Sequence, residues 1–361
     1  MAVYIHIPFC KTICTYCDFC KLYKNDNWIK LYLSALDREI KENYKGEKQE
    51  TIYIGGGTPN CLNDYDFNHL LDIVDIIKRD KFVEYTVECN VDILTEEQIK
   101  IMVSHGVNRV SLGVETFNPK FMRLLGRHHT TREVKEKVEL LKKYGIYNIN
   151  IDLMYAFGNE SIEDLKNDID EIIKLSVPHI STYSLMIEPH TILYTKGVKQ
   201  VEEELDYEMY ETILQKLFNY NHYEVSNFAL TGYESKHNLT YWNNEEYYGF
   251  GLSASGYINK ERYTNTKNLF LYLKNKYKEE SHILSKQEQM ENEMILGLRK
   301  MEGVSISKFK KIYGIDISDY FEIDDLVKNK KLLKDGDYIK INPKYIYTSN
   351  DILINFIKDE I

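Results

Sequence analysis

Short apolar runs alternate with longer amphipathic stretches through the first half of the chain. The runs are rich in Val, Ile and Tyr and predict β-strands over Val3–Ile7, Thr51–Ile54, Tyr85–Glu88, Arg109–Val114, Asn148–Met154 and Ile180–Leu185. The intervening stretches predict helices over Trp28–Tyr44, Asp66–Ile77, Thr95–His105, Arg132–Tyr144 and Ile162–Leu175. Strands that alternate with helices in this way indicate parallel pairing with crossover helices.

Polar groups stand at or just after the ends of these strands. They are the loop that begins at Cys10, the turn Gly55–Thr58, Glu88, Glu115 and Asp152. In a (β/α) barrel, this end of the strands is the face where ligands bind. Because six strands are predicted and not eight, we expect an α/β fold built as a partial (β/α)6, TIM-like barrel.

The second half of the chain predicts further structure beyond the barrel. We expect the barrel to span residues 1–220, an extension that packs on it to span 221–275, and a smaller, mainly helical, winged-helix-like domain to span 276–361. The charged segment Lys274–Glu293 predicts a helix or linker. Near the end, the dipeptide Asp335-Gly336 predicts the turn of a β-hairpin.

Composition narrows the class of protein. The chain has 361 residues, of which 43% are hydrophobic, and this is enough for one large and one smaller domain. A formal net charge of −10 argues against nucleic-acid binding, because phosphate binding needs clustered Lys and Arg. The first apolar run, Ala2–Phe9, lacks the basic lead of a secretory signal, and no window approaches the roughly 20 apolar residues of a membrane span. We therefore expect a soluble, cytoplasmic protein.

Four of the six cysteines fall within eleven residues. In a protein without an export signal, such crowding favours metal binding over disulfides. The spacing Cys10-x3-Cys14-x2-Cys17 places three thiolates on one short loop, so each can bind one iron of a [4Fe–4S] cluster and leave the fourth iron open. The alternative is a zinc site with Cys20 or His6 as fourth ligand, although zinc sites commonly use two separated CxxC pairs.

Two further motifs follow predicted strands. Gly55-Gly56-Gly57-Thr58-Pro59 lets the backbone approach a ligand closely, and its N–H groups can meet a ligand carboxylate. Taken alone, such a segment is usually only a turn. Four charged residues could likewise bond a ligand at the strand ends, although a lone charge is normally a solvated surface group: Glu88, Glu115, Arg127 and Asp152.

In their order and spacing these motifs resemble the radical S-adenosylmethionine superfamily and, within it, the oxygen-independent coproporphyrinogen III oxidase family. The resemblance includes Tyr16 before the third cysteine and the sequences RVSLGVET (109–116), LLGRHHT (124–130) and NIDLMYAFGNES (150–161). Where that family usually has Gln, Gly-x-Pro-Gly and Pro, this chain has Glu115, Ala156-x-Gly158-Asn159 and Val91.

The resemblance implies a cluster on Cys10, Cys14 and Cys17. It also implies that S-adenosylmethionine contacts Tyr4, Tyr16, Gly56, Gly57, Thr58, Glu88, Glu115, Arg127 and Asp152.

A last motif is His237-Asn-Leu-Thr-Tyr241-Trp242. An imidazole suits heme iron, and the two aromatic residues offer surface for a porphyrin. By itself, a histidine is more often a hydrogen-bonded core residue. The segment resembles the HNxxYW signature of HemW-type heme chaperones, which implies heme binding through His237.

Within this family, dehydrogenases carry the pattern CxxxCxxCxC and an N-terminal extension. Here Phe19 stands at the last cysteine position and Cys10 comes early, so the chaperone is favoured. We expect a protein that binds a [4Fe–4S] cluster, S-adenosylmethionine and heme and delivers heme to recipient hemoproteins. Three questions stay open: whether the protein is an enzyme, whether its recipients are associated with a membrane, and whether it forms a homodimer. The alternatives are a coproporphyrinogen III dehydrogenase or another radical S-adenosylmethionine enzyme, and a zinc-binding interaction module.

Overall fold

A computed structural model describes residues 1–358 of the chain. Its centre is a curved sheet in which six parallel strands lie side by side in chain order. They are β1 (Ala2–Ile7), β4 (Gln49–Gly56), β5 (Arg79–Asn90), β6 (Arg109–Glu115), β7 (Asn148–Tyr155) and β8 (His179–Ser184). All six predicted strands are thereby confirmed, and the sheet forms the expected partial barrel.

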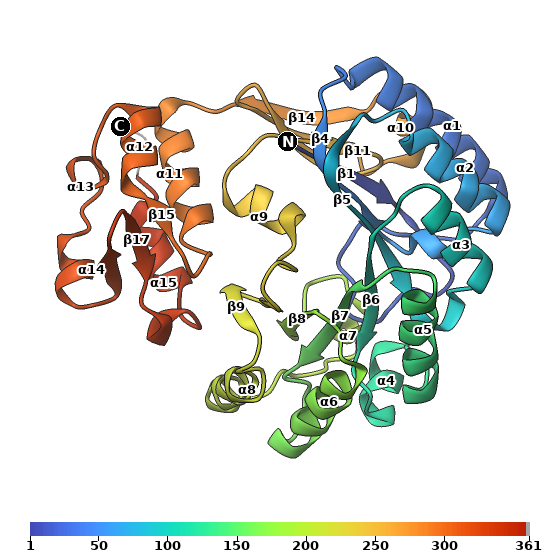
Figure 1. Ribbon diagram of the computed structural model, residues 1–361, viewed down its shortest axis with the longest axis horizontal. Coiled ribbons are helices and arrows are strands. Elements are labelled where there is room, and N and C mark those ends of the chain that lie inside the picture. Colours follow the sequence, from blue (N-terminus) through green and yellow to red (C-terminus); the bar gives the residue numbers. More distant parts are fainter. Residues whose placement is uncertain (359–361) are drawn as a thin grey trace.

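Helices cover the convex face of the sheet (Figure 1). The five predicted helices are present as α1 (Asp26–Asn43), α2 (Asp64–Val74), α3 (Glu96–Ser104), α5 (Thr131–Lys143) and α6 (Ile162–Leu175). Sequence analysis missed three others: α4 (Pro119–Leu125), α7 (Ile192–Thr195) and α8 (Glu203–Lys216). Short 3₁₀ turns, Pro59–Cys61 and Val91–Ile93, follow β4 and β5.

Strand alternation separates the apolar core from the concave interior. In β6, Val110, Leu112 and Val114 belong to the large hydrophobic core shared with the helices. The side chains between them point the other way, because successive strand residues face opposite sides. In β6 these are Arg109, Ser111 and Gly113. Polar and small residues therefore line the interior of the barrel.

The sheet continues beyond both ends of the barrel. On one side β11 (Tyr247–Phe250) pairs in parallel with β1, and three antiparallel strands follow. These are β12 (Ser255–Ile258), β13 (Glu261–Asn265) and β14 (Lys278–Ile283), with α10 (Leu269–Leu273) between the last two. On the other side β10 (Asn227–Ala229) and β9 (Asn221–Glu224) are antiparallel.

The helix or linker expected over Lys274–Glu293 is wrong in its first half. Lys278–Ile283 is the edge strand β14, and only then does α11 (Lys286–Gly297) begin. Every residue of β14 is exposed, so its side chains show no apolar alternation. Main-chain pairing with β13 decides its conformation instead. β14 lies within the expected third segment, 276–361, yet belongs to the large sheet.

The C-terminal part has a core of its own. It contains α11, β15 (Val304–Ser305), α12 (Ile306–Tyr313), α13 (Ile317–Tyr320), α14 (Asp324–Lys328), β16 (Leu332–Asp335), β17 (Tyr338–Ile341), α15 (Asn350–Leu353) and two 3₁₀ turns, Pro343–Tyr345 and Ile354–Phe356. β16 and β17 form the hairpin predicted at Asp335-Gly336. Among residues 1–358, no helix is both long enough and apolar enough to span a bilayer.

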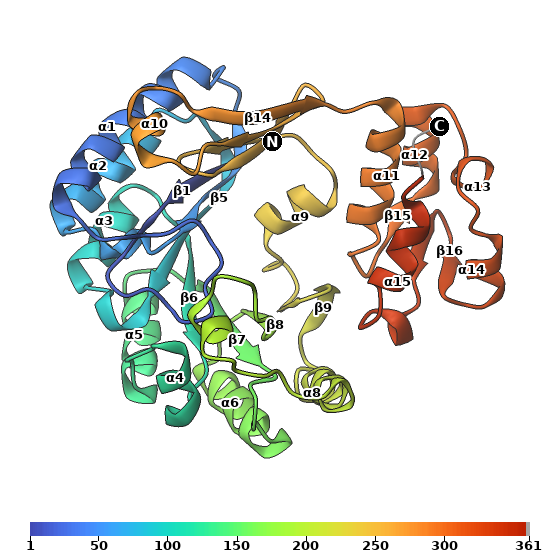
Figure 2. The same ribbon diagram turned by 180° about the vertical axis from the view of Figure 1, so that it is seen from behind.

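Helix α9 (Lys236–Trp242) lies on the concave side, between the barrel and the C-terminal domain, in both views (Figures 1 and 2). Its first turn is fixed to the barrel by Glu84 of β5, whose carboxylate accepts hydrogen bonds from the backbone N–H groups of Lys236 and His237 at 3.2 and 3.1 Å. Negative charge at a helix N-terminus is favourable. The barrel therefore determines where α9 and His237 lie.

Candidate functional site

The cysteine loop leaves the end of β1 and is closed by two short parallel strands, β2 (Phe9–Cys10) and β3 (Leu22–Tyr23). Cys10, Cys14 and Cys17 line a single cavity of about 330 Å³ at the C-terminal ends of the strands. All three are free thiols. Burial raises the pKa of each thiol, for Cys10 to about 11. A bound metal would reverse this effect, because coordination favours the thiolate.

The glycine segment packs directly beneath the cysteine loop. The N–H of Gly57 donates to the carbonyl of Ile7 and the N–H of Thr58 to that of Phe9, both at 2.8 Å. A Cβ on Gly57 would lie 2.8 Å from this backbone. The N–H groups that we expected to face a ligand are therefore used within the protein, and glycine is needed here for close approach of two backbones.

Two side chains complete this wall of the cavity, one from the segment that follows β4 and one from β5. The hydroxyl of Thr58 donates to the sulfur of Cys10 at 3.5 Å. Glu88 is part of the same wall, and its carboxylate accepts from the hydroxyl of Tyr53 at 2.7 Å and from the N–H of Gly56 at 3.0 Å. Burial raises the pKa of Glu88, and these two hydrogen bonds oppose the shift.

The opposite wall holds a buried ion pair. Glu115 ends β6 with a φ of 68°, a left-handed conformation that turns its carboxylate toward Arg127, with which it pairs. The hydroxyl of Tyr16 donates to Glu115 Oε1 at 2.9 Å, and Arg127 Nη1 donates to Asn90 Oδ1 at 2.7 Å. Both charges are therefore compensated inside the protein.

Asp152 is a partly buried residue whose carboxylate lines the cavity and has no basic partner among residues 1–358. It accepts hydrogen bonds from Asn150 Nδ2 at 2.8 Å and Ser111 Oγ at 3.2 Å. Burial, and after it the negative charges of Glu115 and Glu88, raise the pKa of Asp152 to about 7. The group can accept further hydrogen bonds from a polar or positively charged ligand.

A second cavity of about 420 Å³ adjoins the first. Tyr4 and His237 line this second cavity and not the first, in contrast to the other expected cofactor residues: Tyr16, Gly56, Gly57, Thr58, Glu88, Glu115, Arg127 and Asp152. Cys20 also lines the second cavity and is separated from the other three cysteines of its loop. The two cavities share Phe19, Tyr53, Gly56 and Glu88, so they meet along one wall.

His237 is only 2% exposed and both of its ring nitrogens are hydrogen-bonded. Nδ1 lies 2.8 Å from the hydroxyl of Thr51 and Nε2 lies 2.7 Å from the hydroxyl of Tyr241. The ring stacks on Tyr53 with the centroids 4.9 Å apart. Burial, and then the positive charge of Arg109, lower the pKa of His237 to about 3. The imidazole is therefore neutral at physiological pH.

Sequence reasoning missed several interior residues that hold the site together. Tyr53, Asn90, Ser111 and Asn150 all bond to residues that were singled out. Strand periodicity could have found three of them. Each lies two residues from a residue that was singled out or that faces the interior, and residues two apart lie on the same side of a strand. Asn90 follows Glu88, Asn150 precedes Asp152 and Ser111 follows Arg109.

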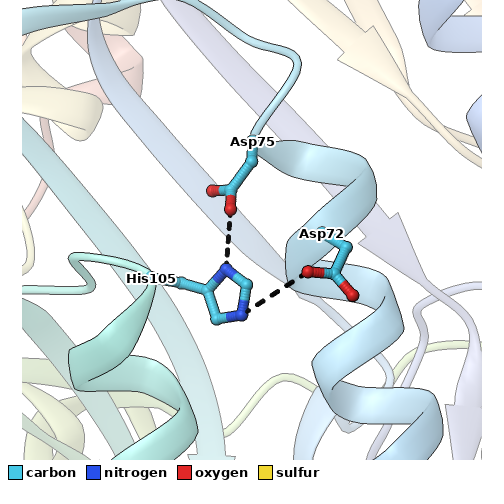
Figure 3. Close-up of side chains that lie close together, drawn as sticks. All are labelled: Asp72, Asp75 and His105. Atoms are coloured by element: carbon cyan, nitrogen blue, oxygen red, sulfur yellow. Dashed lines mark hydrogen bonds and ion pairs between the residues drawn. The ribbon is translucent and has the colours of Figure 1, made fainter.

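A separate group of ionisable side chains lies on the outer, helical layer. His105, after α3, faces Asp75 through Nδ1 at 2.8 Å and Asp72 of α2 through Nε2 at 3.8 Å (Figure 3). Both aspartates are exposed, and Arg79 already pairs with Asp75. These contacts are ordinary surface ion pairs, in which Arg79 already balances the charge of Asp75.

Comparisons with known proteins bear on this geometry. The radical SAM superfamily model matches residues 4–172, and the HemN C-terminal domain model matches residues 284–344. The chain is 41% identical to the heme chaperone HemW of Lactococcus lactis subsp. lactis over 100% of this chain and 98% of that protein. It is 38% identical to the heme chaperone HemW of Bacillus subtilis over 83% of each chain.

A solved structure shows the same fold. The chain superposes on coproporphyrinogen III oxidase (HemN) from Escherichia coli, described as a radical SAM enzyme, with a TM-score of 0.87. The two are 19% identical, and the match covers 98% of this chain and 89% of that one. The expected radical SAM barrel with a smaller C-terminal domain is thereby confirmed. With relatives at this level of identity along its full length, the chain belongs to the HemW family of the radical SAM superfamily.

Proposed function

We propose that the protein is a heme chaperone that holds a [4Fe–4S] cluster, binds S-adenosylmethionine and heme, and passes heme to recipient hemoproteins. The observation that carries this proposal is the pair of adjoining cavities. One contains three thiols from a single loop, and the other contains His237 among aromatic side chains. Relatives that bear the name heme chaperone HemW match the chain over most of its length, which supports the same function.

Cys10, Cys14 and Cys17 would hold the cluster. The donor set fits, because three sulfur ligands from one loop line one cavity and Cys20 lines the other. When bound, such a cluster offers one iron without a protein thiolate, to which S-adenosylmethionine can bind. The hydroxyl of Thr58, which donates to the sulfur of Cys10, would stabilise that thiolate.

S-adenosylmethionine would occupy the remainder of the first cavity. The hydrogen-bond donors of S-adenosylmethionine need acceptors, and its sulfonium group carries a positive charge. Two carboxylates that line this cavity and have no basic partner among residues 1–358, Glu88 and Asp152, meet these needs. Glu115 is different, because Arg127 already neutralises it, so we expect it to orient Tyr16 and Arg127 along the cavity wall. Tyr4 would contact the cofactor only from the adjoining cavity.

Heme would enter the second cavity with His237 as an iron ligand. The neutral imidazole suits this role, since only an unprotonated nitrogen can bind iron. Ligation through Nε2 requires the hydrogen bond between Nε2 and the hydroxyl of Tyr241 to be broken, while Thr51 continues to orient the ring through Nδ1. Tyr4 and Tyr53 offer aromatic surface for the porphyrin.

An anaerobic heme titration of the cluster-loaded protein tests the proposal. We expect His237→Ala to lower heme affinity at least about tenfold and to change the heme absorption spectrum, because an iron ligand is lost. His222→Ala is the matched control, since His222 is partly buried and stacks on Phe228, yet lines neither cavity. Retention of wild-type affinity and spectrum by His237→Ala would contradict heme ligation by this residue.

The main alternative is catalysis, and the fold likeness to a coproporphyrinogen III oxidase favours testing it. An anaerobic assay with coproporphyrinogen III separates the two functions. Protoporphyrinogen formed in stoichiometric amounts would overturn the chaperone proposal. The zinc alternative predicts no charge-transfer absorption at about 400 nm after reconstitution with iron and sulfide.

A further inference from the structure

Tyr241 and His237 form a hydrogen-bonded pair on one face of α9. They are four residues apart, the spacing at which side chains of a helix meet. Nε2 of His237 lies 2.7 Å from the hydroxyl of Tyr241, and the two rings meet edge to face with their centroids 4.9 Å apart. Both residues line the second cavity. The side of the imidazole that carries Nε2 is therefore covered by a residue of the cavity itself.

The other ring nitrogen of His237 is held by the barrel wall. Nδ1 lies 2.8 Å from the hydroxyl of Thr51, a residue of β4 that is 1% exposed and lines neither cavity. The ring stacks on Tyr53 of the same strand, and Glu84 accepts from the backbone N–H of His237. A ligand that enters from the cavity therefore reaches Nε2, so iron and the hydroxyl of Tyr241 compete for the same nitrogen.

Tyr241 is held less firmly than His237. It is partly buried, and its hydroxyl has no hydrogen-bond partner other than His237 among residues 1–358. Its ring contacts that of Tyr247, with the centroids 4.6 Å apart. His237, in contrast, is 2% exposed and is bonded to two strands of the barrel. When iron approaches Nε2, Tyr241 is thus the partner that can move, by rotation about its side-chain bonds.

The hydrogen bond between these two residues stabilises only the empty protein. Without heme it satisfies Nε2, a buried polar atom that would cost free energy if it had no partner. With heme bound, the iron satisfies the same atom. A ligand that must break this bond binds more weakly and leaves more readily, because the bond favours the state without it. Such exchangeable binding suits a protein that passes heme to another protein.

We propose that the hydroxyl of Tyr241 is a reversible cap on His237. The cap covers Nε2 when heme is absent, moves aside when the iron binds, and covers Nε2 again as heme leaves. The inference rests on the proposed function and adds a positioning residue that determines how readily heme is released. Tyr241 does not itself bind the iron in this arrangement.

A heme titration of the cluster-loaded protein, followed by transfer of the heme to excess apomyoglobin, tests the cap. We expect Tyr241→Phe to bind heme about tenfold more tightly than wild type and to release it about tenfold more slowly, because no hydrogen bond to Nε2 opposes binding. The heme absorption spectrum should stay unchanged, since the iron ligand is the same. Tyr241→Leu also lacks the hydroxyl and provides the measurement if Tyr241→Phe does not fold.

Tyr223→Phe is the matched control. The hydroxyl of Tyr223 lies 2.8 Å from Nε2 of the fully buried His179 and accepts from the N–H of Ser235, the residue before α9, yet Tyr223 and His179 line neither cavity. Without heme, both Tyr→Phe variants should melt at a lower temperature than wild type. Only Tyr241→Phe should show a larger rise in melting temperature when heme is added, because only there does binding become tighter.

The outcomes separate the cap from the proposed function. Tyr241→Phe that binds heme no more tightly than wild type, or with a changed spectrum, contradicts the cap, and a changed spectrum would place Tyr241 on the iron. An equal gain in affinity in Tyr223→Phe also contradicts it, since the effect would then come from the position of α9. A wild-type protein that binds no heme contradicts the proposed function. Loss of heme in His237→Ala together with wild-type behaviour of Tyr241→Phe contradicts only the cap.

Discussion

At the scale of single residues, Cys20 is distinguished from the other cysteines of its loop by the cavity that it lines. The carbonyl of Cys20 lies 2.9 Å from His6 Nε2, and its side chain borders the second cavity. We predict that serine at Cys10, Cys14 or Cys17 removes most of the absorbance at about 400 nm after anaerobic reconstitution. Cys20→Ser should keep it, together with wild-type iron and sulfide content. Loss of the cluster in Cys20→Ser would indicate a site closed by four cysteines.

Asp152 provides a prediction about pH. The pKa of its carboxyl is about 7 in the folded protein against 3.8 for the free side chain, so the unfolded chain releases this proton first as the pH rises. Folding therefore becomes less favourable between about pH 4 and pH 7. We expect Asp152→Asn, without cofactors, to gain stability over wild type across this window, by up to about 4 kcal/mol at pH 8.

Chemical denaturation at pH 4, 6 and 8 measures this difference. The same variant should bind S-adenosylmethionine more weakly, because a carboxylate acceptor has been lost. Equal stabilities of the two proteins at all three pH values would show that the Asp152 carboxyl does not carry a raised pKa.

At the scale of elements, the contact between the glycine segment and the cysteine loop depends on the absent side chain of Gly57. We predict that Gly57→Ala costs about 1–3 kcal/mol through overpacking and also reduces cluster loading, because the added methyl group pushes the Ile7–Phe9 backbone away. Gly145→Ala is the control: nothing lies within 4 Å of its Cβ, so only backbone strain at its φ of 88° is added. Full cluster loading in Gly57→Ala would contradict this role.

At the scale of the whole molecule, the barrel and the C-terminal part each have a hydrophobic core of their own. Phe309 and Phe67 are both fully buried, the first in the C-terminal core and the second in the barrel core. Truncation of either to Ala should cost about 3–5 kcal/mol. We expect Phe67→Ala to lower the melting temperature of the cluster absorbance, and Phe309→Ala to lower that of the C-terminal domain while the cluster is retained. Equal loss of the cluster in both variants would mean that the two parts unfold as one unit.

The same contrast of scales explains which elements were predictable. The six barrel strands and five of their helices have apolar residues at regular spacing, because one face of each packs against the core. α8 was missed, and β14 was expected to be a helix or linker. β14 is exposed along its whole length, so no apolar pattern marks it. Its strand conformation comes from main-chain hydrogen bonds to β13, a partner that local sequence cannot reveal.

For the site, local spacing and strand periodicity were informative in different ways. The three cysteines lie within eight residues, so their sequence spacing alone places them on one loop, and the structure brings them to one cavity. Most of the expected cofactor residues line that cavity too, because the ends of parallel strands meet at one edge of the sheet. Tyr4 and His237 line the neighbouring cavity, which depends on how α9 packs across the open side of the barrel.

The amino-acid sequence by itself therefore determined the alternation of strands and helices, the three-thiol loop and the family resemblance, since these are properties of neighbouring residues. Only the tertiary structure decided which charges are paired. Glu115 is neutralised by Arg127, whereas the buried Nε of Arg109 has no hydrogen-bond partner among the described residues. Pairing depends on distances between side chains from different strands, and a shift of a few ångströms in the interior is enough to make or break an ion pair.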